Sequence, residues 1–419
     1  MKRISLFIAS ITLSMACMGQ TKPEKFIGIA AIANDTSYYA QQAEAWHGEI
    51  LKNPKNETAW KYYYMASHYV TWFQDEEGTE EHPLDHIMQE MGKAIPDTYT
   101  YNYCMYRETR LTDGGDTYAD KALKMLPKEK DFFDYDIWTT YLFLHNRIDE
   151  LRPLAKSYYN SGIYSKFVLE SSSNELAALE PNAIYVGTAD IDFIPKLLLI
   201  YGKGERTDVN LVLGGAALLD EDHLNYTLKS LNIDEPFEIE IDEDFASLFE
   251  SDEELDEYMD SYSYYSYDTV HFIYKFIMSR TGRPMYFSRF NNKEHYPWYN
   301  YLDGDGFALR YRNSSTMVNI NEVVEIIKTN CEEKYNLDFL RRPTKDEAWI
   351  SCETLAGMWV EVLDWLAVKY KKDGDTKKLK STTDLLRTIY EGMGYTSEEV
   401  DNMMQETEDF IEDNQVVLK

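Results

Sequence analysis

The stretch Asn182-Ala-Ile-Tyr-Val-Gly187-Thr-Ala-Asp-Ile-Asp-Phe-Ile-Pro195 decides the fold of the middle of the chain. Its apolar run 183–186 is short and is typical of a buried β-strand. A helix is expected at 193–201, where a proline in the first turn is tolerated. A second apolar run at 209–213 predicts the next strand. Strand, helix and strand at this spacing predict a parallel pair with a right-handed crossover.

The residues that follow extend this unit into a small α/β domain. We expect a helix at 216–231, a half-exposed edge strand at 237–242, a helix at 265–279, core strands at 283–289 and 306–312, and a surface loop at 291–305. These elements predict a mostly parallel sheet within an α/β domain that spans residues 176–315.

Helical sequence lies on both sides of that domain. Residues 20–175 contain paired amphipathic segments, which resemble degenerate tetratricopeptide hairpins. We expect helices at 39–51, 59–73, 118–125, 136–144 and 148–159 there, and at 320–329, 348–371, 376–392 and 397–412 in the C-terminal domain, 316–419. The predicted fold class is therefore mixed α and α/β, with tetratricopeptide-like hairpins flanking the sheet.

Composition limits the partners that the chain can have. The formal net charge of −31 disfavours nucleic acid and anionic membrane surfaces, which need clustered Lys and Arg. The acidic stretch 234–260 holds 14 carboxylates and no Lys or Arg, and we interpret it as a solvated face. The 34 tyrosines favour packing between helices over a sugar- or protein-binding surface.

The N-terminus has the pattern of an export signal. Lys2 and Arg3 precede an apolar run that is too short to span a bilayer, which predicts a signal peptide at 1–19. An alternative interpretation is a loose lipobox that makes Cys17 a lipidated first residue. Either scheme predicts a periplasmic or outer-membrane protein without a transmembrane segment in the mature chain.

The ordered motifs of the middle domain resemble those of a known family. Gly187-Thr188, Phe193-Ile-Pro195, Arg206-Thr-Asp-Val, Arg283-Pro-Met-Tyr-Phe and Gly306-Phe-Ala-Leu-Arg-Tyr are similar to motifs in the soluble C-terminal portion of multi-pass membrane proteins common in Bacteroidetes. Those proteins are related to the transmembrane protein O-mannosyltransferases. The resemblance covers about residues 180–390. It implies an exported relative of the accessory portion, and it carries over no catalytic residue, because the membrane half has no counterpart here.

The end of the first predicted strand is the first candidate ligand site. Gly187, Thr188, Asp190 and Asp192 lie where open parallel sheets bind ligands, although carboxylates at a helix start also serve as caps. No GxGxxG or GxxxxGK[ST] motif follows the strand, so neither a dinucleotide nor a P-loop site is predicted, and no cofactor is expected.

A loop rich in aromatic residues is the second candidate ligand site. Arg289, His295, Trp298 and Tyr299 combine rings with a guanidinium and an imidazole, which could stack on a sugar or a peptide. Packing of this loop and of Tyr286 onto the sheet is the competing interpretation.

Metal and catalytic motifs are weak. The segment His82-Pro-Leu-Asp85-His86 has a proline between its histidines, and the fragments at 303–306 and 373–375 lack the ligand spacing of a calcium loop, so we predict no metal site. No GxSxG or SxxK nucleophile motif is present, and no catalytic residue is predicted. Cys104, Cys331 and Cys352 are expected to be buried free thiols rather than a disulfide framework, with a Cys331–Cys352 bridge as the alternative.

These observations predict an exported, non-catalytic scaffold or binding protein of the bacterial cell envelope, with protein partners. The alternative is a glycan-binding or glycan-processing protein associated with envelope glycosylation. A third interpretation is an enzyme that uses Asp190 or Asp192 at the strand end.

Overall fold

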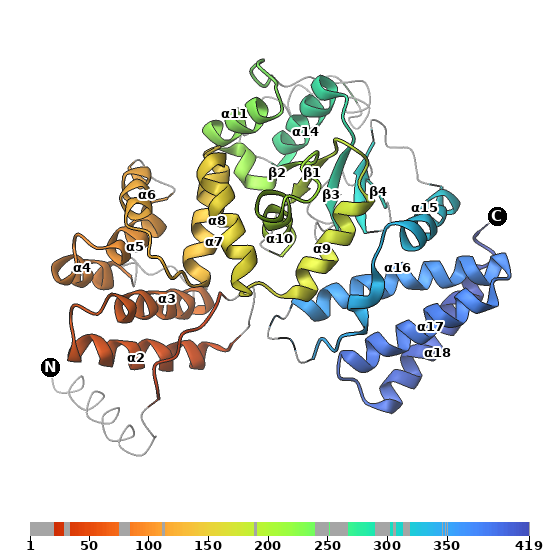
Figure 1. Ribbon diagram of the computed structural model, residues 1–419, viewed down its shortest axis with the longest axis horizontal. Helices are drawn as coiled ribbons and strands as arrows, with labels where there is room; N and C mark the ends of the chain where they lie inside the picture. Colours follow the sequence, from red (N-terminus) through yellow and green to blue (C-terminus); the bar gives the residue numbers. More distant parts are fainter. Residues whose placement is uncertain are drawn as a thin grey trace. The chain divides into compact units, whose positions relative to one another are not determined.

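The computed structural model of the chain divides into two compact units, Met1–Phe133 and Asp134–Lys419 (Figure 1). Both consist mainly of helices, and the second also contains a small β-sheet. The structure describes residues 21–28, 34–74, 84–110, 114–187, 191–238, 251, 267–289, 302–304, 307–312, 319–345, 347, 349 and 351–418.

Two helices of the first unit, α2 and α5, begin at residues whose side chains cap them. They are α2 (Thr36–Lys52), α3 (Glu57–Gln74), α4 (Asp85–Ala94), α5 (Tyr99–Thr109) and α6 (Gly115–Lys124). Asp35 precedes α2, and its side chain accepts a hydrogen bond from the backbone N–H of Tyr38. Thr98 caps α5 in the same way. The helices predicted at 39–51, 59–73 and 118–125 are confirmed.

Aromatic rings form the core of this unit. The ring of Phe26 packs edge-to-face on those of Tyr39, Tyr62 and Phe133, at centroid distances of 5.5, 5.3 and 5.8 Å. The Tyr62 hydroxyl donates a hydrogen bond of 3.0 Å to the carboxylate of Asp131. The tyrosines here therefore pack between helices while their hydroxyls find partners, as the composition suggested.

The second unit contains a sheet, and helices precede and follow its strands along the chain. Its helices are α7 (Phe132–Leu144, which starts at the end of the first unit), α8 (Ile148–Ser161), α9 (Lys166–Ala178), α10 (Phe193–Leu197), η1 (Leu198–Lys203), η2 (Gly215–Leu219), α11 (Glu221–Ser230), α14 (Tyr267–Thr281), α15 (Ile320–Glu333), η5 (Leu337–Arg341), α16 (Ser351–Asp373), α17 (Thr376–Gly392) and α18 (Ser397–Asn414). Its strands are β1 (Ile184–Gly187), β2 (Asn210–Leu213), β3 (Met285–Ser288), β4 (Leu302–Gly304) and β5 (Ala308–Tyr311).

The sheet is mixed, with the strand order β2-β1-β3-β5-β4. β1 pairs in parallel with both β2 and β3, whereas β5 is antiparallel to β3 and to β4. The prediction of a mostly parallel sheet is therefore wrong for the half beyond β3. The short connection from Gly304 to Ala308 cannot hold a crossover, so β4 and β5 form a hairpin. β4 also lies within the predicted surface loop 291–305, at its described end.

The two faces of the sheet differ in chemistry because strand residues alternate between them. Ile184, Val186, Met285 and Phe287 lie on the apolar face, in one buried cluster with residues of α11 and α14. Tyr185 and Tyr286 alternate with them and face the side of α9 and α10. Figure 1 shows α11 and α14 on one side of the strands and α9 and α10 on the other.

The strand–helix–strand unit predicted at 183–213 is confirmed, with a change of helix type. After α10 the chain forms a π-helical turn, η1, before it reaches β2. Gly202 in η1 packs directly on α8: a Cβ at this position would lie 2.7 Å from the backbone oxygen of Ala155. Only glycine permits so close an approach, which places η1 against α8.

The helix predicted at 216–231 is divided into two elements. A 3₁₀ turn, η2, ends at Asp220, whose side chain accepts a hydrogen bond from the backbone N–H of His223 and so starts α11. Local capping therefore overrode the continuous helical pattern.

The C-terminal helices α15 to α18 match the predicted helices, with ends that differ by a few residues. Trp359 of α16 is fully buried and donates a hydrogen bond of 2.9 Å to the Ser171 hydroxyl of α9. A capping box of Thr396 and Glu399 starts α18. Within the described residues, no helix combines the length and apolarity that a membrane span requires. The predicted edge strand 237–242 and acidic stretch 234–260 lie mostly outside the described residues.

Candidate functional site

The carboxyl ends of β1 and β3 form the first candidate site. The chain passes from β1 to β2 on one side and later to β3 on the other, so the strand order reverses at β1. Open α/β sheets bind ligands at such a point. The structure places Gly187 and Asp192 at this edge, as the sequence predicted, while Thr188 and Asp190 lie outside the described residues.

Beside these strand ends lies a buried polar cluster of three side chains from three elements. The Lys196 ammonium of α10 lies 2.6 Å from the Glu175 carboxylate of α9, with 1% and 4% of the two side chains exposed. The Tyr185 hydroxyl of β1 donates a hydrogen bond of 2.7 Å to the same carboxylate. Lys196 also donates to the backbone oxygen of Asp192 at 2.9 Å and lies over the Tyr185 ring. We call Glu175, Tyr185 and Lys196 the buried triad.

The electrostatics of the buried triad indicate a structural role. Burial raises the pKa of Glu175, whereas the contacts with Lys196 and Tyr185 lower it. Burial, together with the Glu175 carboxylate, raises the pKa of Tyr185 well above its usual value. A buried charge needs such partners, because each would cost several kcal/mol if it were left alone. The three groups therefore satisfy one another's charge and hydrogen-bonding capacity, and their contacts connect α9 and α10 to β1.

Asp192 and Gly187 also have roles in packing at this edge. Asp192 occupies the N-cap position of α10 and is 1% exposed, but its side chain makes no capping hydrogen bond, contrary to the capping interpretation. A Cβ at Gly187 would lie 3.1 Å from the Cβ of Phe193, so glycine permits the tight passage from β1 to α10.

Of the second candidate site, the structure describes only the residues up to Arg289. Arg289 forms an ion pair of 2.6 Å with Glu361 of α16, and Tyr286 is buried in β3 with its hydroxyl 3.0 Å from the Glu180 carboxylate. Tyr286 is thus part of the sheet itself. His295, Trp298 and Tyr299 lie outside the described residues, as does Cys17.

The remaining motifs have local roles where the structure describes them. Among the described residues, no group of His, Cys, Asp and Glu is arranged to hold a metal ion. Asp375 caps α17, and the exposed His86 lies 3.5 Å from Glu90 on the same helix. Cys331 and Cys352 are free thiols, so the alternative of a bridge between them is wrong. Burial raises their pKa values to about 12 and about 11.

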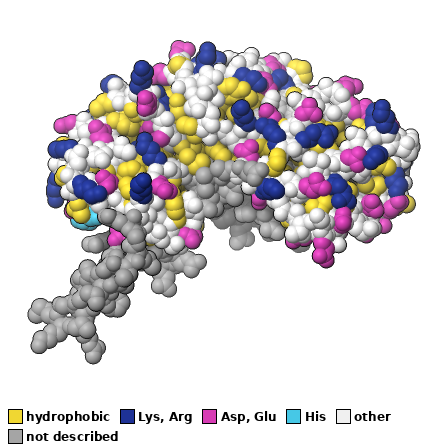
Figure 2. Space-filling view, turned by 60° about the horizontal axis from the view of Figure 1, so that its bottom comes forward, with side chains coloured by type: hydrophobic (Ala, Val, Ile, Leu, Met, Phe, Trp, Pro, Cys, Tyr) yellow, Lys and Arg dark blue, Asp and Glu magenta, His cyan; other side chains and the backbone are white. Residues whose placement is uncertain are grey.

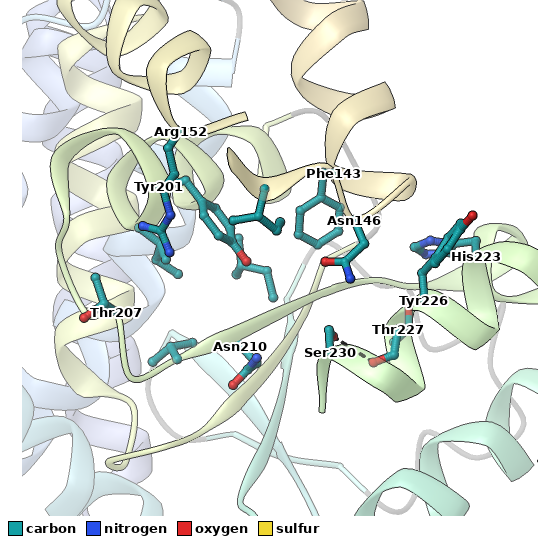
Figure 3. Close-up of a pocket in the computed structure, with 14 residues that line it drawn as sticks. Phe143, Asn146, Arg152, Tyr201, Thr207, Asn210, His223, Tyr226, Thr227 and Ser230 are labelled. Atoms are coloured by element: carbon teal, nitrogen blue, oxygen red, sulfur yellow. Dashed lines mark hydrogen bonds between the residues drawn. The ribbon is translucent and has the colours of Figure 1, made fainter. Parts of the chain in front are cut away.

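A pocket of about 280 Å³ is the second candidate site (Figure 3). Residues of α7, α8, η1, β2 and α11 and of the segments that join them line this pocket, which we call the β2 pocket. Its lining includes Asn146, Arg152, Tyr201, Leu211, His223 and Tyr226. This volume is just below the range that is usual for small-molecule sites, roughly 300–1,000 Å³.

The β2 pocket lies along β2, the edge strand of the sheet as far as the structure describes it. α11 covers the apolar face and η1 the opposite face, yet both line this pocket together with β2 itself. Asn210 and Gly214 donate their backbone N–H groups to β1, so the intervening Leu211 and Leu213 direct their backbone groups to the outer edge. No strand of the described residues pairs with this edge, so a ligand in the pocket can reach it.

Two side chains dominate the polar chemistry of the β2 pocket. Arg152 lies over the ring of Tyr201 at 5.5 Å, and Figure 3 shows the two side chains running alongside one another. The ring nitrogens of His223 lie 3.3 and 3.4 Å from the backbone oxygens of Leu213 and Leu144. Burial lowers the pKa of His223, while these two carbonyl groups act in the opposite direction. His223 thus closes the pocket at the Leu213 end of β2.

Sequence reasoning did not find the β2 pocket. Its residues come from five elements and the segments between them, and each element taken alone follows an ordinary helical or strand pattern. The usable signals were the edge position of the second strand and the polar residues Thr207 and Asn210 beside it.

A second pocket, of about 370 Å³, lies between β5 and α15. Two of its three cationic groups have these partners: Arg310 pairs with Glu180 at 2.7 Å, and Lys334 donates to the backbone oxygen of Ala178 at 3.1 Å. The third, Arg312, is also engaged in an interaction. This pocket therefore offers less unsatisfied polar chemistry than the β2 pocket.

Basic and acidic side chains are interspersed on the surface. On the face shown in Figure 2, Lys and Arg lie among Asp and Glu rather than gathering in one patch. A nucleic-acid surface would need such a patch.

Comparison with known proteins adds no relative. No model of a known protein family matches the chain, and neither a curated protein nor a solved structure matches it.

Proposed function

We propose that this chain is a non-catalytic scaffold or binding protein of the bacterial cell envelope, and that the β2 pocket is where it binds a partner. The observation that carries the proposal is the pocket itself, which joins five elements around an edge of β2 that no other described strand covers. Export follows from the signal-like residues at 1–19.

The contrast between the two candidate sites supports binding over catalysis. At the ends of β1 and β3, the groups of the buried triad are bonded to one another and closed to solvent. In the β2 pocket, hydrogen-bonding groups such as Asn146 and Tyr226 line an accessible space. Groups that are accessible and not arranged as a nucleophile and its base are suited to hold a ligand.

The helical hairpins add a surface for protein partners. The helices α2 and α3 pack together, as do α5 and α6, and such paired helices resemble the hairpins with which helical repeat proteins present an interaction surface. The family resemblance also supports an accessory role beside envelope glycosylation.

In-cell photo-crosslinking tests this proposal. A photoreactive residue replaces Tyr226, which lines the pocket and is 36% exposed, in a bacterium that exports the chain. A matched probe replaces Tyr395, which is 37% exposed and lies outside the pocket. We expect a defined crosslinked product at position 226 that is absent at position 395.

A blocking variant makes the test specific for the pocket. Ser230 lines the pocket and its neighbour Lys229 does not, so Ser230→Trp should fill the space while Lys229→Trp leaves it open. The crosslink at 226 should disappear in the first variant and persist in the second. Crosslinks that are insensitive to both variants would remove the pocket from the proposal.

A glycan-binding function is the second candidate, and one observation favours it. Phe143, Tyr201 and Tyr226 bring three aromatic rings into the same pocket as the amides of Asn146 and Asn210. Rings and planar polar groups together are the chemistry that stacks on a sugar and bonds its hydroxyls.

Calorimetry with envelope glycans tests this second function. We expect binding that weakens at least tenfold in Tyr201→Ala, while Tyr395→Ala binds as well as the unaltered chain. Absence of heat for every glycan in a broad panel, alongside an intact crosslink at 226, would exclude it.

A further inference from the structure

We propose that the β2 pocket binds its ligand through a carboxylate, which the guanidinium of Arg152 holds. The inference rests on the proposed binding function and adds the chemistry of the ligand.

The charge of the pocket is opposite to that of the chain. The sequence has 73 Asp and Glu against 42 Lys and Arg, yet none of the 14 residues that line the pocket is acidic. Arg152 is the one permanently charged group among them. A chain this acidic repels an anion over much of its surface, so a lining without carboxylates favours this pocket for an anion.

Arg152 is available for an ion pair. Its side chain is exposed and lies over Tyr201, and within the described residues no carboxylate pairs with it. By contrast, Arg147 at the start of the same helix is held by Glu150 at 2.8 Å. A guanidinium that rests on a ring keeps its planar fork oriented, and the fork matches the two oxygens of a carboxylate.

The outer edge of β2 provides further hydrogen-bonding groups for the ligand, in addition to Arg152. The backbone N–H and C=O of Leu211 point to the outer edge of β2, where they can bond a donor and an acceptor on the ligand. His223 covers the backbone oxygen of Leu213, so the accessible edge is short. A ligand that fits has a carboxylate close to a polar group with both a donor and an acceptor.

Two kinds of molecule carry this chemistry: the C-terminal end of a peptide and an acidic sugar such as a uronic acid. Both fit a pocket of about 280 Å³ through one terminal unit. The shared carboxylate is the proposal, and the experiment distinguishes the two sources.

Isothermal titration of the full mature chain tests the carboxylate in two matched pairs of probes. One pair is a library of short peptides with free C-termini and the same library with amidated C-termini. The other pair is oligogalacturonate and neutral oligogalactose. We expect binding of the acidic member of one pair, at least tenfold tighter than its neutral member, and this pair identifies the source.

Variants on α8 test the anchor. Arg152→Gln should weaken binding of the acidic probe at least tenfold, because a charge-assisted hydrogen bond pair is lost. Lys156→Gln removes the same charge from an exposed position on the same helix that does not line the pocket, and should change binding less than twofold. Unchanged thermal unfolding of both variants shows that the fold is intact.

Several results would overturn the inference. Equal binding of acidic and neutral probes, equal losses in Arg152→Gln and Lys156→Gln, or no binding of any acidic probe would each do so. The crosslink at position 226 separates this failure from failure of the binding function: a crosslink lost in Ser230→Trp but kept in Arg152→Gln rejects the carboxylate anchor and leaves the binding function standing.

Discussion

The buried triad and the β2 pocket lie on neighbouring strands of one sheet. The polar groups of the triad are buried and bonded to one another, whereas those of the pocket are accessible. Glu175, Tyr185 and Lys196 are closed to solvent and bonded to one another. In the pocket, Arg152 is exposed beside Tyr201 and an open strand edge. Polar residues at the ends of parallel strands therefore do not by themselves form a ligand site. They can bind a ligand only where their hydrogen-bonding groups are accessible and not already bonded within the protein.

Removing the countercharge of the triad should give the largest effect. Lys196→Met leaves the Glu175 carboxylate buried without its partner, and we expect the free energy of unfolding to fall by about 3–5 kcal/mol. Urea denaturation at pH 7 measures it. The control is Lys203→Met, whose ion pair with Glu205 has 45% and 23% of its side chains exposed and should contribute under about 1 kcal/mol. Similar losses in both variants would contradict the assigned role of the triad.

The second largest loss of stability is expected where the backbone of Gly202 in η1 lies against α8. In Gly202→Ala the new Cβ meets the backbone oxygen of Ala155, so η1 must move away from α8, at a cost of about 1–3 kcal/mol. The same movement would separate Tyr201 from Arg152 and weaken ligand binding. Gly357→Ala in α16 is the control, because nothing lies within 4 Å of its Cβ, and should leave stability unchanged or raise it slightly. Thermal unfolding of both variants checks the prediction, which a neutral Gly202→Ala would refute.

Asp364 is a partly buried carboxyl that lacks partners like those of the triad, and its pKa is shifted as a result. Burial raises its pKa to about 7, despite a hydrogen bond with Thr407, and its Oδ1 lacks a hydrogen-bond partner. The folded chain thus binds this proton more tightly than the unfolded chain, whose carboxyl has its usual pKa of about 3.9. The free energy of unfolding should therefore fall as the pH rises from about 4 to about 7.

Asp364→Asn should remove that pH dependence. We expect the variant to be about 2 kcal/mol more stable than the unaltered chain at pH 8, less than the full pKa shift implies because the side chain is partly exposed, and nearly equal at pH 4. Urea denaturation at the two pH values measures the difference. A stability gain that is the same at both would show that the carboxyl does not titrate as described.

Two tyrosine hydroxyls give the smallest and most direct comparison of the two regions. Tyr185→Phe removes the hydrogen bond to the buried Glu175 and should cost about 1–2 kcal/mol of stability. Tyr201→Phe in the pocket should change stability by less than about 0.5 kcal/mol. Chemical denaturation of the two variants in parallel decides the point, and a larger loss at Tyr201 would reverse the comparison.

Local patterns were sufficient for most elements of the second unit. The apolar runs at 183–186 and 209–213 became β1 and β2, and the segment 376–392 became α17, because burial on one face leaves a period that can be read from the residues. The antiparallel half of the sheet was not predictable in this way. An apolar strand such as β5 has the same pattern in either direction, and its pairing depends on which neighbour it reaches.

The candidate sites were predictable only in part. The strand-end position of Gly187 and Asp192 followed from the order of elements, but the pairing of Glu175 with Lys196 joins two helices, and helical periodicity gives no information on contacts between helices. Arg289 was expected to face a ligand, whereas the structure pairs it with Glu361, far away in sequence.

The sequence by itself determined the acidic charge, the types of most helices and strands, and the absence of the usual phosphate-binding motifs after β1. Each of these depends on residues that are neighbours along the chain. Only the tertiary structure decided which polar groups are satisfied and which are accessible. The β2 pocket exists because η1, α11 and the α7–α8 turn meet at one edge of the sheet, and such a meeting depends on packing between residues up to tens of positions apart.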